Sequence, residues 1–254
     1  MIFIRSCLIR SKSPVIFSPY WYNGFVPPIP NRTEFFLSRT RVKICCISSR
    51  EEARTAIQTG ADALGLVSSM PSGPGVISDE IIRDIARIIP PPIASFLLTS
   101  KQDAAAIVTQ QKFCGTNTIQ ICDHLTNGTY EVIRKALPGI AIVQVVHVTD
   151  ESSINEAIRV SEFADAVLLD SGNQKLAVKE LGGTGRKHDW RISARIRAAI
   201  KVPLFLAGGL NVENVREAIE TVQPFGIDLC SSVRTDGKLD KAKLERLFEV
   251  VHHI

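Results

Sequence analysis

Residues 201–222, KVPLFLAGGLNVENVREAIETV, contain one complete strand–turn–helix unit. The apolar run at 203–207 is short and continuous, which is typical of a strand buried on both faces of a parallel sheet. Gly208 and Gly209 then mark a tight turn, and residues 212–222 carry apolar side chains at helical spacing. Asn211 lies where the N-cap of that helix is expected.

The same unit repeats from residue 41 to the end of the chain. Strands are predicted at residues 42–47, 63–67, 93–98, 118–122, 140–147, 166–170, 203–207 and 227–230. Helices are predicted at 51–59, 79–89, 103–113, 130–136, 154–163, 192–200, 212–222 and 241–251. Eight alternating units predict a closed (β/α)8 barrel, or TIM barrel, over residues 41–254 rather than an open doubly wound sheet. No Gly-x-Gly-x-x-Gly follows the first strand, so the dinucleotide-binding alternative lacks its signature.

Residues 1–40 differ from this pattern. They contain five prolines and scattered aromatic residues, without helical or strand periodicity. Five basic residues stand against Glu34 alone, so this segment carries the whole net charge of +4. The composition loosely resembles an organelle transit peptide. The plainer interpretation is a poorly ordered N-terminal extension, or a stretch ahead of the true start of the protein.

Composition excludes several functional classes. The chain is 45% hydrophobic and 22% charged, which is typical of a globular protein and not of a disordered one. No apolar run reaches the roughly 18–20 residues that cross a membrane. Residues 41–254 are balanced in charge and lack the clustered Lys and Arg that contact phosphates of nucleic acids. We therefore expect neither a membrane nor a nucleic acid as partner.

The six cysteines form no CxxC pair, and no histidine lies at a spacing that completes a zinc site. A chain of this length builds its core without disulfides. We therefore expect reduced thiols, a cytoplasmic location, and no metal.

Chemistry in a (β/α)8 barrel takes place at the carboxyl ends of the strands. Gly208 and Gly209 follow the seventh predicted strand, and Ser231 and Ser232 follow the eighth. Glycines let backbone N–H groups approach phosphate oxygens, and the N-terminus of a helix adds positive partial charge. A tight turn requires glycine in any case, but the two serines in the next loop favour a phosphate site.

Cys45 and Asp170 are the candidate acid–base pair. Strand alternation places Cys45 and Lys43 on one face of the first strand and Cys46 on the other. If Cys45 points into the barrel, Lys43 does too, and Cys46 faces the helices as a packing residue. A thiolate can abstract a proton from carbon, although a buried cysteine is often only a packing residue. Asp170 ends an apolar run, where a buried carboxylate needs a partner. The alternative role for Asp170 is a loop cap.

Several motifs occur together in a characteristic order: VKIC at 42–45, GADALG at 60–65, LLDS at 168–171, GGTG at 182–185 with DW at 189–190, AGGLN at 207–211 with ENV at 213–215, and PFGID at 224–228. On these motifs, residues 41–254 resemble the phosphoribosylanthranilate isomerase family of tryptophan biosynthesis. The resemblance implies an Amadori rearrangement of N-(5-phosphoribosyl)anthranilate to 1-(2-carboxyphenylamino)-1-deoxyribulose 5-phosphate, without a cofactor. It implies a small phosphorylated sugar as the only partner, and the chain is expected to be a monomer or a homodimer.

The resemblance also assigns roles to individual residues. Asp170 is implied as the general acid that protonates the furanose ring oxygen, and Cys45 as the general base that removes the C2′ proton. Phosphate is implied at Gly208, Gly209, Ser231 and Ser232. The remaining implied substrate contacts are Lys43, Gln120, Gly183, Thr184 and Gly185.

The chain departs from the family pattern at the anthranilate end of the site. Gly75 lies where the family carries an arginine that faces the substrate carboxylate, and Cys46 replaces the usual glycine. Arg186 or Lys187 is a possible substitute for that arginine. Two alternatives therefore stay open: an isomerase acting on a different phosphoribosylated amine, and a non-catalytic barrel that binds a phosphorylated ligand.

Overall fold

The computed structural model describes residues 39–172, 176–183 and 185–254. Thr184 and residues 1–38 of the predicted extension lie outside the described residues. Eight parallel strands pair in sequence order and close into a barrel, β1(Arg41–Ile44), β2(Ala63–Val67), β3(Ala94–Thr99), β4(Thr118–Ile121), β5(Ala141–His147), β6(Ala166–Asp170), β7(Leu204–Leu206) and β8(Gly226–Leu229). The predicted (β/α)8 barrel is confirmed.

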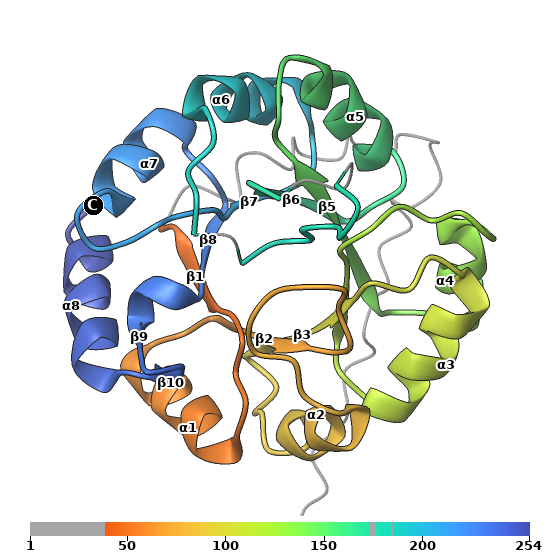
Figure 1. The fold of residues 1–254 in the computed structure, drawn as a ribbon, viewed down its shortest axis with the longest axis horizontal. Coiled ribbons are helices and arrows are strands. Elements are labelled where there is room, and N and C mark those ends of the chain that lie inside the picture. The colour runs from red at the N-terminus through yellow and green to blue at the C-terminus, as the bar shows by residue number, and fades with distance from the viewer. Residues whose placement is uncertain (1–38, 173–175, 184) are drawn as a thin grey trace, which may run out of the picture. The chain divides into compact units, whose positions relative to one another are not determined.

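Helices surround the barrel, as Figure 1 shows. They are α1(Arg50–Thr59), α2(Asp79–Ala86), α3(Ala104–Cys114), α4(Tyr130–Ala136), α5(Ser152–Ser161), α6(Trp190–Ala199), α7(Val215–Val222) and α8(Lys241–His252). Most begin at a side chain that accepts a hydrogen bond from the first turn, as Ser49 does from the Glu52 amide and Ser78 from the Ile81 amide. Across the described residues, no helix has the length and apolar character that crossing a membrane requires.

Several boundaries differ from the sequence-based prediction, and one hairpin was not predicted. Strand β1 ends at Ile44, three residues before the predicted end. Helix α7 begins at Val215 instead of residue 212, because Asn211 caps a turn by accepting hydrogen bonds from the Glu213 and Asn214 amides. After β8 come a short 3-10 helix, η2(Ser231–Val233), and an unpredicted hairpin of β9(Arg234–Thr235) and β10(Lys238–Leu239).

Apolar side chains fill the barrel interior and, separately, the layer between strands and helices. Alternate residues of the strands point inward, among them Phe96 and Phe205, whose rings meet edge to face with centroids 5.8 Å apart. The outer layer is built from residues such as Leu97, Leu169 and Leu244. Because both faces of every strand are covered, the strands read as nearly continuous apolar runs in the sequence.

The barrel closes where the first strand pairs with the last. Lys43 on β1 is in register with Asp228 on β8, and its Nζ lies 2.6 Å from Asp228 Oδ2. The Lys43 side chain is fully buried, and its Nζ also lies 5.2 Å from the centroid of the Phe96 ring. Burial opposes the charge on Lys43, but the nearby Asp228 and Cys45 outweigh it and raise the Lys43 pKa above its ordinary value.

Replacing Lys43 is expected to leave the Asp228 carboxylate buried without its ammonium partner. We predict that Lys43→Met lowers the free energy of unfolding by about 3–5 kcal/mol, measured by urea denaturation. Lys241→Met is the matched control, since it breaks an exposed ion pair with Glu245 on α8 and is expected to cost less than about 0.5 kcal/mol. Equal losses for the two variants would contradict a structural role for the buried pair.

Candidate functional site

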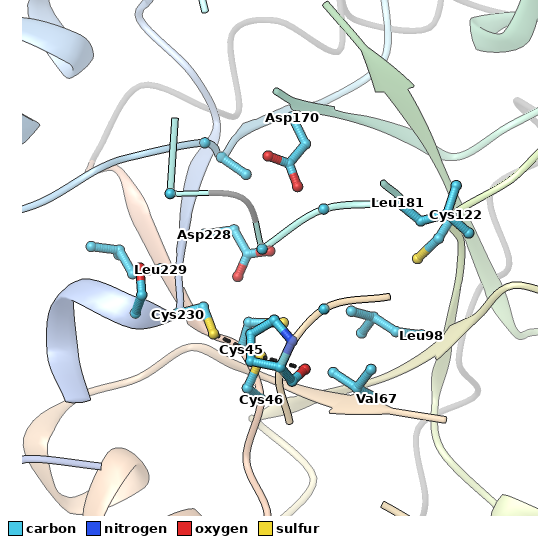
Figure 2. A pocket seen from close by; sticks show the side chains of 18 of the residues that line it. Cys45, Cys46, Val67, Leu98, Cys122, Asp170, Leu181, Asp228, Leu229 and Cys230 are labelled. Carbon is cyan, nitrogen blue, oxygen red and sulfur yellow. Dashed lines mark hydrogen bonds between the residues drawn. The ribbon is translucent and has the colours of Figure 1, made fainter. Parts of the chain in front are cut away.

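A pocket that is open to solvent lies at the carboxyl ends of the strands. Its walls come from β2, β3, β4, β6 and β8 and from the loops that follow β1, β2, β4, β6, β7 and β8. Figure 2 shows Asp170 on one side of this opening and Cys45 on the other. The pocket therefore brings together two candidate residues that lie 125 positions apart in the sequence.

The Asp170 carboxyl group is buried and held by the backbone that follows it. Its Oδ1 accepts a hydrogen bond of 2.7 Å from the Ser171 amide. A Cβ atom at Gly182 would lie 2.5 Å from Oδ2, and one at Gly208 would lie 3.2 Å from Oδ1. The two glycines thus leave open the space in front of the carboxyl group, where a reacting group has to approach it.

The Cys45 thiol also depends on a glycine for its space. A Cβ atom at Gly65 on β2 would lie 2.8 Å from Cys45 Sγ and 3.1 Å from Lys43 Nζ. The Cys45 amide donates to the Leu229 carbonyl at 2.8 Å, which fixes the residue against the end of β8. Cys45 therefore faces the barrel interior with Lys43, as strand alternation predicts.

Cys46 does not face the helices, and that prediction is wrong. The residue has a φ of 61°, so the chain leaves the strand conformation and the alternation of side chains ends. Its Sγ points into the pocket, where it lies 2.7 Å from Cys230 Sγ and 3.5 Å from the Pro74 carbonyl oxygen. A left-handed φ favours glycine, which explains why glycine is usual at this place in the family that the sequence resembles.

Gly75 and Cys46 depend on each other sterically. Gly75 has a φ of 77°, and a Cβ atom there would lie 2.4 Å from the Cys46 Cβ and 2.9 Å from its Sγ. The Cys46 side chain thus occupies the space through which a side chain at position 75 would leave the backbone. The two departures from the family pattern are one linked exchange.

The loops after β7 and β8 form a second, adjoining hollow. It is lined by Gly185, Gly209, Leu210, Asn211, Val212, Glu213, Ser231, Ser232, Val233, Lys243, Arg246 and Leu247. The Ser232 hydroxyl oxygen is buried and has no partner among the described residues. Gly208 and Gly209 have φ values of 84° and 64°, which shape the turn as the sequence predicts. Glycine-rich backbone, an unpartnered hydroxyl group and two cationic side chains are features that suit a phosphate group.

The other implied substrate contacts fall into three groups. Gln120, Gly183 and Gly185 line the main pocket, and the side-chain oxygen of Gln120 has no hydrogen-bond partner within the described residues. Lys43 lies beneath the pocket floor, where it holds Asp228, which does line the pocket. Thr184 lies outside the described residues.

Two features escaped the sequence analysis. Arg234 is buried in an ion pair with Glu52, with Nη1 2.9 Å from Oε1, and its Nη2 donates to the carbonyl oxygens of Cys45 and Cys46. It thereby anchors the backbone that carries both cysteines. His188 is half-buried near Asp170 and bonds Ser193 Oγ at 2.7 Å, and burial lowers its pKa. No local sequence signal marks the contacts of Arg234, since they join distant elements, whereas His188 and Ser193 lie five positions apart in the sequence.

The closed barrel has a pocket with convergent polar groups at the carboxyl ends of its strands, which is where barrel enzymes carry their active sites. These features define a (β/α)8-barrel protein. Residues 42–250 match the family model described as N-(5'phosphoribosyl)anthranilate (PRA) isomerase. The chain belongs to this family.

Individual relatives agree with that assignment. The N-(5'-phosphoribosyl)anthranilate isomerase of Methanothrix thermoacetophila is 36% identical over 209 residues, covering 81% of this chain and 95% of the relative. The crystal structure of phosphoribosyl anthranilate isomerase from Thermotoga maritima aligns with a TM-score of 0.71 and 30% identity, covering 85% of this chain and 100% of that one. Another, with a TM-score of 0.68, 29% identity and the same two coverages, is a complex with reduced 1-(o-carboxyphenylamino)-1-deoxyribulose 5-phosphate.

Removing the Ser232 hydroxyl group is expected to weaken the binding of inorganic phosphate. One hydrogen bond to a charged group contributes about 1.5–3 kcal/mol, so Ser232→Ala should raise the Kd for phosphate at least about tenfold in calorimetric titration. Ser161→Ala removes an exposed hydroxyl group bonded to the Ile158 carbonyl, and it should leave the Kd unchanged. An unchanged Kd in Ser232→Ala would place the anion elsewhere.

The linked exchange at positions 46 and 75 predicts non-additive stability. Gly75→Arg alone should lower the free energy of unfolding by roughly 1–3 kcal/mol, because its Cβ overlaps Cys46. Adding Cys46→Gly should recover at least about 0.5 kcal/mol of that loss in a double-mutant cycle measured by denaturation. Gly139→Arg is the matched control, because Gly139 also has a positive φ, of 86°, but no atom lies within 4 Å of an added Cβ there. The effects of Gly139→Arg and Cys46→Gly on the free energy of unfolding should be additive. Additive effects at 46 and 75 would contradict the steric link.

Proposed function

We propose that this chain is an aldose–ketose isomerase that converts N-(5-phosphoribosyl)anthranilate to 1-(2-carboxyphenylamino)-1-deoxyribulose 5-phosphate, a step of tryptophan biosynthesis. The observation that carries the proposal is the placement of Cys45 and Asp170 on two sides of one pocket, in a chain that belongs to the isomerase family. A thiol and a carboxyl group facing one cavity are the pair that transfers a proton to one atom of a sugar and removes one from another.

The reaction starts at Asp170. The carboxyl group donates a proton to the furanose ring oxygen, the bond from that oxygen to C1′ breaks, and the open chain carries a Schiff base at C1′. Gly182 and Gly208 leave the carboxyl oxygens accessible, so the ring oxygen can come within hydrogen-bond distance of them.

Cys45 performs the second step. Its thiolate removes the proton from C2′. The C2′–H electrons form a C1′=C2′ double bond, and the C1′=N π electrons pass to nitrogen, which gives an enolamine that tautomerises to the ketose product. The Lys43 ammonium lies beside the Cys45 sulfur, as the shared approach to Gly65 indicates, and it provides positive charge next to a thiolate. Both steps use only protein side chains, so the proposal includes no cofactor.

The phosphate group anchors the substrate at the second hollow, which Gly209, Ser231 and Ser232 line next to Gly208. That hollow shares Gly185, Gly209 and Ser231 with the main pocket. A sugar phosphate held there extends its ribose into the space between Cys45 and Asp170. With the phosphate group bound, the ribose is held next to both catalytic side chains, which lowers the entropic cost of bringing the reacting groups together.

The acid–base roles predict a large loss of rate on removal of either group. Cys45→Ala and Asp170→Asn should each lower kcat by about 10²–10⁴-fold, measured as the loss of anthranilate-type fluorescence on conversion of phosphoribosylanthranilate. Cys114→Ala removes another buried thiol, outside the pocket, and should keep activity. Circular dichroism checks that the variants are folded. Activity that survives in both variants would rule out the assigned roles.

A second candidate is the same rearrangement on a phosphoribosylated amine without a carboxylate. The described residues that line the main pocket include no Lys, Arg or His, and Gly75 cannot supply the family's cation. Neither suggested substitute lines the pocket, because Arg186 forms an ion pair with Glu180 and the Lys187 ammonium lies 5.1 Å from the Trp190 ring centroid. Comparing kcat/KM for phosphoribosylanthranilate and for the phosphoribosyl amine of aniline separates the candidates. A preference for the aniline compound would favour this second one.

We also propose a monomer or a homodimer in the cytoplasm. A related protein from Thermotoga maritima is described as a dimeric phosphoribosylanthranilate isomerase. The cysteines of the described residues are free thiols, which suits a reducing compartment.

A further inference from the structure

Two thiol groups that the proposed reaction does not use meet at the wall of the pocket. Cys46 follows the end of β1, Cys230 follows the end of β8, and their Sγ atoms lie 2.7 Å apart although the residues are 184 positions apart in the sequence. Both residues line the main pocket, and Figure 2 shows their side chains pointing toward each other. In the chain, Cys46 directly follows the proposed base, Cys45, and Cys230 directly precedes the proposed phosphate contact, Ser231.

The barrel itself holds the two thiols together. The Cys45 amide bonds the Leu229 carbonyl, so the two strand ends are joined one residue before each thiol. Arg234 donates to the Cys46 carbonyl oxygen and is itself fixed by Glu52. A disulfide requires two cysteines whose backbones already approach each other, and this hydrogen bonding supplies that approach.

The two thiols differ in accessibility and in pKa, and thiol–disulfide exchange needs one accessible thiol that ionises easily. Cys230 is half-buried and reachable from the pocket, whereas Cys46 is buried. Hydrogen bonding from Cys46, together with nearby Arg234, lowers the pKa of Cys230, while the same contact raises the pKa of Cys46. Cys230 is therefore the attacking thiolate, and Cys46 is the resolving thiol.

We propose that Cys46 and Cys230 form a reversible disulfide that switches off the pocket, with a small-molecule disulfide such as oxidised glutathione as the oxidant. The loss of activity rests on the proposed function, whereas formation of the bond does not. In a reducing compartment such bonds are transient and act in redox sensing.

The chemistry balances in two exchanges. The Cys230 thiolate attacks one sulfur of oxidised glutathione, which forms a mixed disulfide and releases one glutathione thiolate. Cys46 then loses its proton to solvent, and its thiolate attacks Cys230 Sγ and expels the second glutathione thiolate. Two electrons pass from the protein thiols to the glutathione disulfide, and the products are the protein disulfide and two molecules of glutathione. Reduced glutathione in excess reverses both steps.

Closure of the bond affects the pocket because Cys46 is joined directly to Cys45 and Cys230 to Ser231. The sulfur atoms have to approach further for the bond to form, and each pulls on a residue that touches the substrate in the proposed mechanism. A displacement of about 1 Å at a reacting group costs as much as 10²-fold in rate.

The test uses the full chain, reduced and then equilibrated with oxidised glutathione. We expect mass spectrometry of the unreduced digest to show a peptide pair linked through Cys46 and Cys230, with the mass of two hydrogen atoms lost. Turnover of phosphoribosylanthranilate should fall at least about tenfold and return on reduction. Cys230→Ser should abolish the change on oxidation, compared with the same variant when reduced. Cys46→Ser should stop at a mixed disulfide between Cys230 and glutathione, because the resolving thiol is missing. Cys114→Ala should keep both its activity and its response to oxidation.

The outcomes separate the two proposals. If both thiols remain open to alkylation after oxidation, or if the bond joins Cys45 instead of Cys46, the disulfide proposal is overturned. A disulfide that forms without changing turnover overturns its role as a switch. A chain that fails to turn over phosphoribosylanthranilate when fully reduced contradicts the proposed function, and the mass measurement still decides whether the disulfide forms.

Discussion

Closure of the barrel between β1 and β8 is the constraint on which the rest of this structure depends. Lys43 and Asp228 meet in register across that seam, inside the barrel and away from water. Separation of this pair would leave a buried charge without a partner, so the register of the first strand against the last is strongly fixed. The residues that follow the two strands, Cys45 and Cys46 on one side and Cys230 and Ser231 on the other, are placed by that register.

Three glycines leave the space that the side chains of Cys45 and Asp170 need in the pocket. Gly65 makes room for the Cys45 sulfur, and Gly182 and Gly208 leave both oxygens of Asp170 open. A Cβ atom at any of these positions would approach the reacting groups to between 2.5 and 3.2 Å. The glycines of the family motifs are therefore part of the geometry of the site, and their positive φ values at Gly182 and Gly208 are a second reason for the residue type.

The anthranilate end of the site has exchanged one kind of chemistry for another. Where the family has glycine and an arginine, this chain has Cys46 and Gly75, and the contact between them permits a side chain at only one of the two positions. The exchange removes a cation and introduces a thiol beside Cys230. The second candidate substrate and the proposed disulfide therefore both involve the contact between Cys46 and position 75.

The sequence alone determined the eight strand–helix units, the shared face of Lys43 and Cys45, and the strand ends that carry Asp170, Gly208 and Ser231, because periodicity and turn residues are local properties. Tertiary structure decided what local patterns cannot encode. The positive φ of Cys46 ended the strand alternation and turned its thiol into the pocket, against the prediction. The contacts of Arg234 with Glu52 and of Cys46 with Cys230 join residues more than 180 positions apart, and only the closed barrel makes them neighbours.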